Sequence, residues 1–113
     1  MNFDVVEELM DKSIVKNLML NPKDTPLILT ESSVHNKETR LKLTEFCFEK
    51  LQVPALFICK DSVLTAFSCG RSTALVLDLG NTHSTATPVH DGYALQKSIV
   101  RHPIGGATLT QLL

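Results

Sequence analysis

The sequence predicts an α/β protein in which a βαβ unit is followed by an antiparallel hairpin layer. Two short apolar runs, residues 27–30 and 55–59, are bounded by turn-forming residues and separated by a helical pattern, as in a βαβ unit. From residue 73 onward, extended runs flank Asp91-Gly92, which is a strong short-range hairpin signal. With 113 residues, the chain is long enough for one small domain or a part of one.

The first helix is expected over residues 4–19. Asp4 and Glu7 resemble a capping box at its start. The apolar residues that follow recur at steps of three and four along the chain: Val6, Leu9, Met10, Ile14 and Leu18. Asn21-Pro22 ends this helix, because proline cannot continue the helical hydrogen-bond pattern.

The second helix is expected over Lys37–Leu51, with Asn36 as its N-cap. Its apolar residues cover more than one face, so we expect the helix to be packed on two sides. These residues are Leu41, Leu43, Phe46, Cys47, Phe48 and Leu51. Pro54 then opens the second strand, Ala55–Cys59.

Two shorter helices are also expected. Asp61 can cap a helix that runs through Phe67, and Gly70 ends it in the left-handed conformation. The segment 108–113 also has helical character, although a helix of about two turns is marginal by itself. Its apolar residues have no evident partner within the sequence: Leu109, Leu112 and Leu113.

Residues 73–101 are expected to form a three-stranded antiparallel meander. The strands are expected at 73–78, 83–90 and 93–100. A turn at Gly80–Thr82 joins the first two strands, and Asp91-Gly92 joins the second and third.

Charge and cysteine content exclude several functional classes. Lys and Arg together number 11 against 12 for Asp and Glu, and no block of like charges occurs, so neither nucleic-acid binding nor membrane-surface binding is indicated. No apolar run approaches the roughly 18 residues of a membrane span, and no signal peptide is visible. Cys47, Cys59 and Cys69 lie in apolar surroundings, and we expect them to be buried free thiols in a reducing compartment, the nucleus or cytosol.

The segment Asp78-Leu79-Gly80-Asn81-Thr82 is the candidate for chemistry. It places a carboxylate at the end of a strand, a glycine in a tight turn and small polar residues after it. A glycine lets backbone amides approach a polyphosphate, a hydroxyl adds a donor, and an aspartate can hold a hydrated magnesium ion. A plain turn at the end of a strand has the same pattern, so both interpretations stay open.

The hairpin region resembles the second phosphate loop of the actin family. The resemblance runs without a gap through Cys69–Gly80 and continues through Pro88–Leu95. Upstream segments are similar to actin strands and helices in the same order and spacing: Pro26–Glu31, Arg40–Glu45, Pro54–Phe57 and Ser62–Leu64. The resemblance therefore covers essentially the whole chain.

Within that family, Lys60–Phe67, Gly70–Thr73 and Pro88–Tyr93 look most like the nuclear actin-related subunit of SWI/SNF-type (BAF) remodelling complexes. The resemblance implies a fragment of the actin-like ATPase (ribonuclease H-like) fold and a nuclear location. It implies ATP and Mg²⁺ as family ligands. It also implies, as partners, subunits of chromatin-remodelling or histone-acetyltransferase complexes, with actin itself as a further candidate. Residues 1–72 would form the C-terminal part of actin subdomain 1, and residues 73–113 the start of subdomain 3.

The resemblance also implies nucleotide-binding residues. Asp78 and Gly80 match the phosphate loop, with Asp78 holding the metal through water, and Gly106 matches a glycine near the adenosine. Asn81 stands where the family has an aspartate and Thr82 where it has a glycine, which removes a charge and makes the loop less permissive. For Gly106, a glycine that simply starts a helix is the alternative interpretation.

Two further departures concern hydrolysis. Asp61 stands where actin has the glutamine that orients the attacking water, and Thr85 where it has a histidine beside the γ-phosphate. An ionised aspartate repels the phosphate that it faces and lacks the donors of an amide. Efficient hydrolysis of ATP is therefore not expected, even in a complete chain.

Other polar residues have simpler interpretations. His83 and His90 have no ligand partner at zinc-site spacing and are expected at the surface, as is Arg71. The run Ser84–Thr87 resembles a phosphate site, but it also fits a strand, in which threonine is favoured, and we prefer the strand. Cys47 and Cys69 are expected to be packing residues rather than nucleophiles.

Three functional hypotheses follow. The chain is a structural, non-hydrolysing actin-related subunit, or a piece of one, that acts by protein contact in a nuclear chromatin complex. Alternatively, it is an ATP-binding actin-like cytoskeletal protein or a weak ATPase, for which Asp78, Gly80 and Thr82 are the motivation. The third alternative is a truncated product without independent function, in which the unfinished C-terminal helix leaves the fold incomplete.

Overall fold

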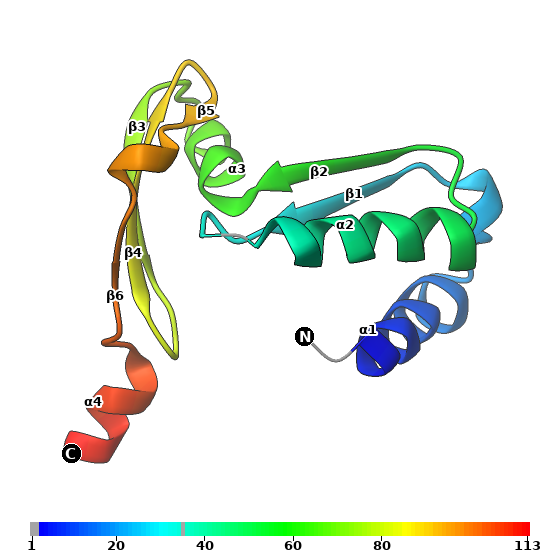
Figure 1. The fold of residues 1–113 in the computed structure, drawn as a ribbon, viewed down its shortest axis with the longest axis horizontal. Helices are drawn as coiled ribbons and strands as arrows, with labels where there is room; N and C mark the ends of the chain where they lie inside the picture. The colour runs from blue at the N-terminus through cyan, green and yellow to red at the C-terminus, as the bar shows by residue number, and fades with distance from the viewer. Residues whose placement is uncertain (1–2, 35) are drawn as a thin grey trace. The chain divides into compact units, whose positions relative to one another are not determined.

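The computed structural model describes residues 3–34 and 36–113 as a mixed α/β structure (Figure 1). The elements in chain order are α1 (Phe3–Met10), η1 (Asp11–Asn17), η2 (Pro22–Asp24), β1 (Leu27–Glu31), α2 (Lys37–Glu45), η3 (Phe46–Lys50), β2 (Leu56–Lys60), α3 (Asp61–Ser68), β3 (Ala74–Leu79), β4 (Ser84–His90), β5 (Tyr93–Ala94), η4 (Gln96–Ser98), β6 (Val100–His102) and α4 (Gly106–Leu112). The predicted α/β fold class is confirmed.

Two compact units divide the described residues. The first unit comprises the residues up to Leu29 together with Asn36–Ile58, and the second comprises the remaining described residues. Each unit has its own hydrophobic core. The assignment of residues 1–72 and 73–113 to two actin subdomains stays a prediction, since these units are defined by compactness alone.

The first predicted helix is confirmed as one helical stretch, α1 followed by η1. Its second half is wound as a π-helix, in which the Leu18 N–H donates to the Ser13 carbonyl five residues earlier. Met19 then adopts φ +53°, and this left-handed residue ends the helix. Asp4 lies inside the first turn rather than at the cap, because the helix already includes Phe3.

The predicted N-cap of the second helix is also confirmed. The Asn36 side chain accepts a hydrogen bond from the Glu38 N–H at 2.9 Å. Only one face of α2 and η3 is covered, however. Leu41 is 61% exposed and Phe48 is 47% exposed, so the expected packing on two sides is wrong for the described part of the chain. The β1–β2 sheet packs against one face of this helical stretch, and the other face stays exposed.

Strands β1 and β2 pair as a two-stranded sheet, and Figure 1 shows their arrows running in the same direction. The core of the first unit lies on one face of this sheet. It contains Phe46, Cys47 and Val53, with Met10, Leu27, Leu29, Leu51 and Leu56 packed around them. On the opposite face, Ile28 is 66% exposed and Phe57 is 59% exposed. One face of this sheet is therefore uncovered in the described chain.

In the second unit, β4 is the central strand and pairs with β3, β5 and β6. Asp91 and Gly92 have φ values of +48° and +79°, as a two-residue hairpin turn requires, so the predicted β4–β5 hairpin is confirmed. The predicted third strand, 93–100, is interrupted by η4. The Leu95 N–H donates to the Pro88 carbonyl, but Pro88 has no N–H to donate in return, so the ladder stops there.

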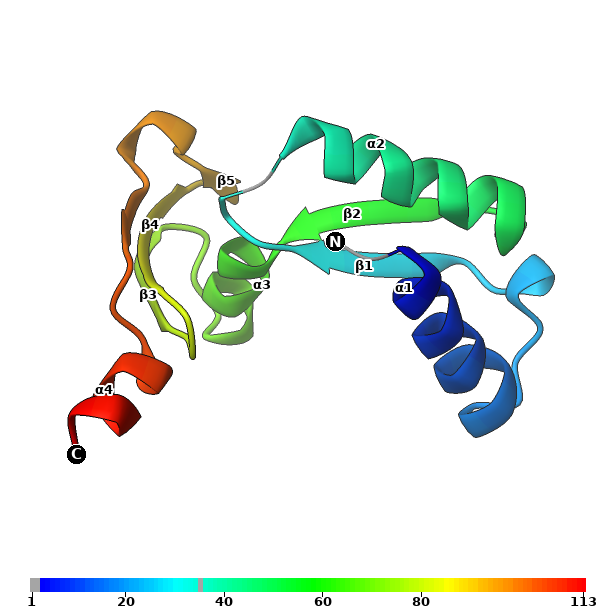
Figure 2. The ribbon, with the colours of Figure 1, turned by 60° about the horizontal axis from the view of Figure 1, so that its bottom comes forward.

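Helix α3 packs against one face of β3 and β4 (Figure 2). Val63 and Ala66 of α3 form a buried core with Val76 and Val89. The end of α3 is a Schellman motif, in which the Gly70 and Arg71 N–H groups donate to the Phe67 and Ala66 carbonyls. Gly70 adopts φ +68°, as the sequence predicts.

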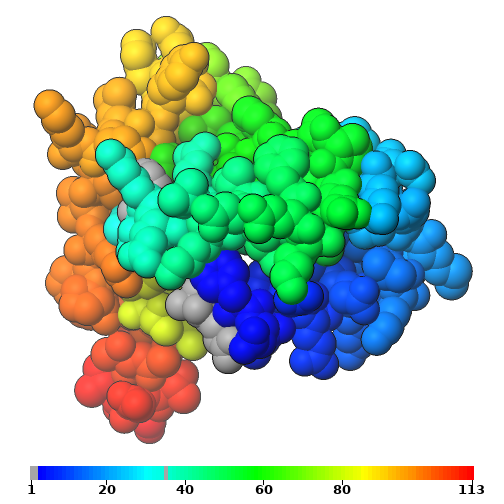
Figure 3. Space-filling view, turned by 45° about the vertical axis from the view of Figure 1, so that its right-hand side comes forward, coloured from blue at the N-terminus to red at the C-terminus, as the bar shows by residue number. Residues whose placement is uncertain are grey.

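The outer face of β3 is uncovered. Leu75, Leu77 and Leu79 are 66%, 66% and 80% exposed, although a strand that alternates in this way normally places such residues in a core. Helix α4 is also thinly covered. It projects as a separate lobe in the space-filling view (Figure 3), and its Leu109 and Leu112 are exposed.

The cysteines differ in exposure, which corrects one expectation. All three are free thiols, but only Cys47 is buried, while Cys59 is half-buried and Cys69 is exposed. Cys69 follows the end of α3, where the chain turns outward through the Schellman motif. None of the helices in residues 3–34 and 36–113 combines the length and hydrophobicity needed to cross a lipid bilayer.

Candidate functional site

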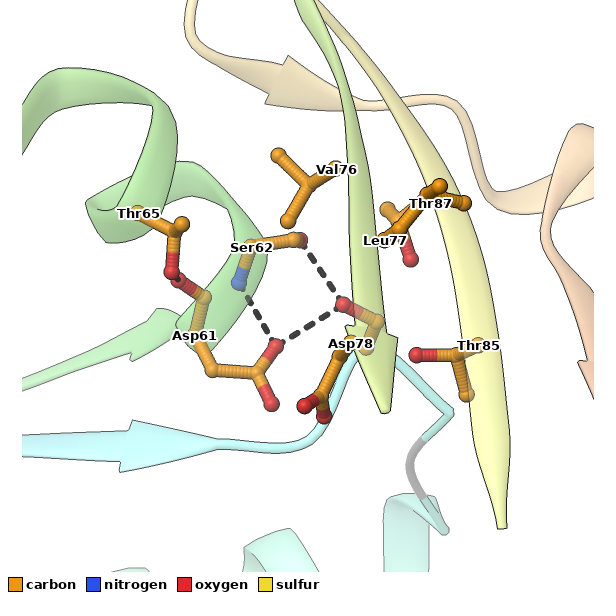
Figure 4. A pocket seen from close by; sticks show the side chains of 9 residues that line it. Asp61, Ser62, Thr65, Val76, Leu77, Asp78, Thr85 and Thr87 are labelled. Atoms are coloured by element: carbon orange, nitrogen blue, oxygen red, sulfur yellow. Dashed lines mark hydrogen bonds between the residues drawn. The ribbon is translucent and has the colours of Figure 1, made fainter. Parts of the chain in front are cut away.

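A pocket of about 190 Å³ lies in the second unit, where the start of α3 meets one face of the β3–β4 hairpin (Figure 4). Its lining residues come from α3, from β3 and β4, and from the segment that follows β1. They are Ser33, Asp61, Ser62, Thr65, Val76, Leu77, Asp78, Thr85 and Thr87. The lining contains two carboxylates and five hydroxyl groups, and it contains no basic residue.

Strand register places the hairpin residues at this pocket. Val76 lies opposite Thr87, and Asp78 lies opposite Thr85. Residues directly opposite each other, and residues two apart along a strand, share one face of a sheet. Asp78 therefore stands on the same face as the core residue Val76, at the point where that face leaves the core.

Asp61 is fixed by hydrogen bonds at the start of α3. Its Oδ1 accepts from the Ser62 N–H at 2.6 Å and from the Ser33 hydroxyl at 2.8 Å. The Ser33 and Ser62 hydroxyl oxygens are 2.7 Å apart, and both side chains are buried. The predicted role of Asp61 as a helix cap is met in part, since its carboxylate binds the first free amide of the helix, although Asp61 is already the first helical residue.

A nearly buried ion pair between Lys60 and Glu31 lies next to Ser33. Lys60 Nζ lies 3.5 Å from the Glu31 carboxylate, and these side chains are 14% and 10% exposed. The same ammonium group donates to the Ser33 carbonyl at 3.3 Å. The charge of Lys60 is therefore directed toward Glu31 and the backbone, and Lys60 is not part of the pocket lining.

The turn between β3 and β4 is bound to the start of α4. The Gly106 N–H donates to the Gly80 carbonyl, and the Ala107 N–H donates to the Asn81 carbonyl, each at 2.9 Å. Within the turn, the Gly80 N–H donates to the His83 carbonyl at 3.1 Å. Two of the turn's carbonyl groups are thus bound by the first amides of α4.

The predicted nucleotide-binding residues fall into two groups. Asp78 lines the pocket, whereas Gly80, Asn81 and Thr82 form the turn beyond it and are not in the lining. Gly106 lies beside Asn81, so the structure brings it next to the β3–β4 turn. Nucleotide binding by these residues stays a prediction.

Sequence reasoning missed three hydroxyl residues of the pocket, Ser33, Ser62 and Thr65, and it assigned Thr87 to a strand in preference to a site. Asp61 and Thr85, by contrast, were singled out as departures from the actin pattern. Ser62 and Thr65 are three residues apart on a helix, a spacing that places both on one face. Ser33 is distant in sequence from Asp61, and no local pattern connects the two.

The donor set of the pocket fits a hard cation better than an anion. Carboxylate and hydroxyl oxygens are the ligands that Mg²⁺ and Ca²⁺ prefer, usually together with water. Among the described residues, no group of three or more His, Cys, Asp or Glu side chains is arranged to hold a metal ion. An Mg²⁺ ion of the kind the resemblance implies would therefore be held by Asp61 and Asp78, through water and the threonine hydroxyls.

Comparison with known proteins identifies the family. The family model described as Actin matches residues 1–113. A protein named Actin-related protein 4 from Arabidopsis thaliana is 43% identical over 112 residues, which is 99% of this chain and 25% of that protein. Its namesake from Oryza sativa subsp. japonica is 41% identical over the same share of each chain.

A further relative of the same name, from Mycosarcoma maydis, is 39% identical over 97 residues, or 86% of this chain and 18% of that protein. The chain thus spans about a quarter or less of the length of these curated relatives. The match of the family model over all 113 residues, together with the fold described above, shows that the chain belongs to the actin family.

Proposed function

We propose that this actin-related chain acts as a structural, non-hydrolysing element of a nuclear chromatin-remodelling or histone-acetyltransferase complex. The observation that carries the proposal is the uncovered apolar face of β3, formed by Leu75, Leu77 and Leu79. A strand face of this kind is stable in water only when another layer covers it. The chain therefore functions by contact with further polypeptide.

The sequence resemblance supports the choice of assembly. The relatives of this chain are called Actin-related protein 4, and the segments Lys60–Phe67 and Pro88–Tyr93 resemble the nuclear actin-related subunits of remodelling complexes. Subunits of such complexes, with actin as a further candidate, are the partners that we propose. A nuclear location follows from the same proposal.

The pocket supports a role without hydrolysis. Asp61 has a carboxylate side chain where the resemblance places the glutamine amide of actin, and its Oδ1 is bound by the Ser62 amide and the Ser33 hydroxyl. A carboxylate in that position repels the terminal phosphate and cannot donate a hydrogen bond to a water molecule. ATP and Mg²⁺ would be ligands of a complete actin-like cleft, in which this chain supplies the turn Gly80–Thr82 and Asp78.

Affinity purification tests the proposal. The tagged chain is expressed in nuclei, and the proteins that co-purify with it are identified by mass spectrometry. We expect a remodelling ATPase or an acetyltransferase subunit among them, and we expect Leu77→Glu to reduce its recovery at least tenfold, because a charge on the uncovered face opposes burial.

Lys97→Glu is the matched control, since it changes the charge of η4 and leaves the apolar face intact. Recovery of these subunits should be equal for this variant and the unmodified chain. Absence of every chromatin-complex subunit from the unmodified sample, at normal levels of the bait, would refute the proposed role.

A further inference from the structure

We propose that a different pocket of the second unit, the Arg101 pocket, binds a carboxylate side chain of a partner polypeptide, and that Arg101 recognises this carboxylate. The pocket has a volume of about 260 Å³ and is lined by Ser33, Val34, Gln96, Ile99 and Arg101. All of these residues belong to the second unit. The inference deepens the proposed role by protein contact and rests on that role for the source of the carboxylate.

The Arg101 pocket is distinct from the acidic pocket at the start of α3, with which it shares only Ser33. Its lining contains one arginine and no carboxylate, whereas two carboxylates line the acidic pocket. In the sheet, Thr85 lies opposite Asp78 on one side and opposite Arg101 on the other. Neighbouring strands are about 4.8 Å apart, so about 10 Å separates the backbones of Asp78 and Arg101. Salt largely screens exposed charges over such a distance, so Asp78 does not neutralise Arg101.

Arg101 is available to a ligand. In the described part of the chain, no hydrogen bond or ion pair engages its guanidinium group, and its side chain is exposed. Glu31, two residues before the lining residue Ser33, is engaged by Lys60 at 3.5 Å. A guanidinium group carries five N–H donors in a fixed fork that matches the two oxygens of a carboxylate. The pocket therefore offers a binding group for a carboxylate without a competing one in its lining.

The rest of the lining favours a carboxylate on an apolar stem over a phosphate ion. Val34 and Ile99 present apolar surface to the methylene groups of a glutamate or to an adjacent apolar residue, and Gln96 adds an amide donor. A phosphate group carries about 1.5 to 2 negative charges at pH 7, which a single guanidinium group does not balance. Because Arg101 is the one basic residue of the lining, its charge matches a single carboxylate.

The size of the pocket also fits a side chain. Pockets for drug-sized ligands measure roughly 300–1,000 Å³. The Arg101 pocket is smaller than this range, so it fits one side chain and part of its neighbour better than a larger ligand.

The Arg101 pocket and the uncovered face of β3 are separate surfaces. Residues directly opposite each other share a face of the sheet, and neighbouring residues along a strand point to opposite faces. Arg101 therefore shares a face with Asp78, while Leu77 lies on the other face. A contact at the pocket can be removed without altering the apolar face formed by Leu75, Leu77 and Leu79.

Nuclear magnetic resonance of the full ¹⁵N-labelled chain tests the site with two blocked tripeptides. One has a glutamate between two leucines, and the other has a glutamine in that position. We expect the glutamate peptide to give saturable shifts centred on the amides of Val34, Ile99 and Arg101, with a dissociation constant on the order of 10⁻³ M. The glutamine peptide should bind about fivefold more weakly, which is close to the most that an exposed ion pair contributes.

Two variants give the test its resolution. Arg101→Gln should weaken binding of the glutamate peptide about fivefold and leave binding of the glutamine peptide unchanged, a difference that a merely structural role would not produce. Lys97→Gln is the matched control, because it removes one positive charge from η4, outside the lining. It should bind both peptides like the unmodified chain. Inorganic phosphate, titrated at the same ionic strength, should bind more weakly than the glutamate peptide.

The outcomes that overturn the site are distinct. Equal affinity for the two peptides shows that no carboxylate is recognised, and tighter binding of phosphate assigns the pocket to another class of ligand. Equal losses in Arg101→Gln and Lys97→Gln show an effect of net charge alone. Should Arg101→Gln fail to fold, the contrast between the two peptides on the unmodified chain decides, and an unfolded spectrum of that chain with peptide present also refutes the site.

Failure of this site and failure of the proposed function are distinguishable. If the peptides do not bind while recovery of complex subunits still depends on Leu77, the Arg101 pocket alone is refuted. If the peptides bind as expected while no chromatin-complex subunit is recovered, the proposed assembly is refuted, and with it the proposed source of the carboxylate.

Discussion

At the scale of single residues, Asp61 illustrates what a sequence can and cannot predict. Its identity alone predicts that ATP is not hydrolysed efficiently, because an ionised carboxylate cannot replace an amide, and this stays a prediction. Its hydrogen bonds could not be predicted, since Ser33 approaches Asp61 only through the pairing of β1 with β2. The same holds for Thr87, whose burial depends on α3 packing over β4.

The three thiols should differ in reactivity with an alkylating reagent. Burial raises the pKa of the Cys47 thiol above its ordinary value, whereas Cys69 is exposed. Because the thiolate is the reactive form, we expect Cys69 to be alkylated first and Cys47 only when the chain unfolds. Mass spectrometry after timed quenching gives the order. Rapid modification of Cys47 in the folded chain would show that the core of the first unit is open.

The raised pKa of Cys47 also predicts how the free energy of unfolding depends on pH. Below the ordinary thiol pKa both states are protonated, so the Cys47 thiol adds no pH dependence to the free energy of unfolding. Above that pKa, the unfolded chain ionises more readily than the folded one. The free energy of unfolding should therefore fall as the pH rises above the ordinary value, and Cys47→Ser should reduce this fall.

At the scale of elements, most of the fold could be predicted from local patterns. Breakers around short apolar runs predicted β1 and β2, and Asp91-Gly92 predicted the β4–β5 hairpin. The prediction of one continuous third strand was wrong because Pro88, on the neighbouring strand, has no N–H to continue the ladder. The effect of this proline on residues 93–100 can be recognised only when the strand register is known. The predicted packing of α2 on two sides was wrong. An apolar pattern shows which side chains would gain from burial, but it does not show that a neighbouring element buries them.

The contact between the β3–β4 turn and α4 leads to a prediction. A Cβ atom added at Gly105 would lie 2.7 Å from the Gly80 carbonyl oxygen and would also meet the backbone of Asn81, which cannot move as a side chain can. Gly105→Ala should therefore lower the free energy of unfolding by about 1–3 kcal/mol, as overpacking does. Urea denaturation of the full chain measures this value.

Gly106→Ala is the matched control for that substitution. A Cβ atom there would meet nothing closer than the Asn81 Oδ1 at 3.6 Å, which is an ordinary contact. Alanine is also a better helix former than glycine, so this variant should be neutral or more stable by up to about 1 kcal/mol. Equal destabilisation by both substitutions would show that the turn is not bound to α4 in the manner described.

At the scale of the whole molecule, the uncovered apolar faces are the dominant feature. Ile28 and Phe57 are exposed on one sheet, and Leu75 and Leu77 on the other. The matched part of this chain covers 25% of the Arabidopsis thaliana relative and 18% of the Mycosarcoma maydis relative. The sequence could predict the family and the two pocket residues that depart from the actin pattern, Asp61 and Thr85. The uncovered faces could not be predicted, because they depend on how the strands and helices pack.

The central proposal is that this chain acts by protein contact and that its contribution to a nucleotide site is Asp78 and the turn Gly80–Thr82. Calorimetric titration of the isolated chain with ATP, at a constant excess of Mg²⁺, tests that claim most directly. Because the pocket lining has two carboxylates and no basic residue, we predict no saturable binding in the low micromolar range. Tight, magnesium-dependent ATP binding that is lost in Asp78→Ala would contradict the account.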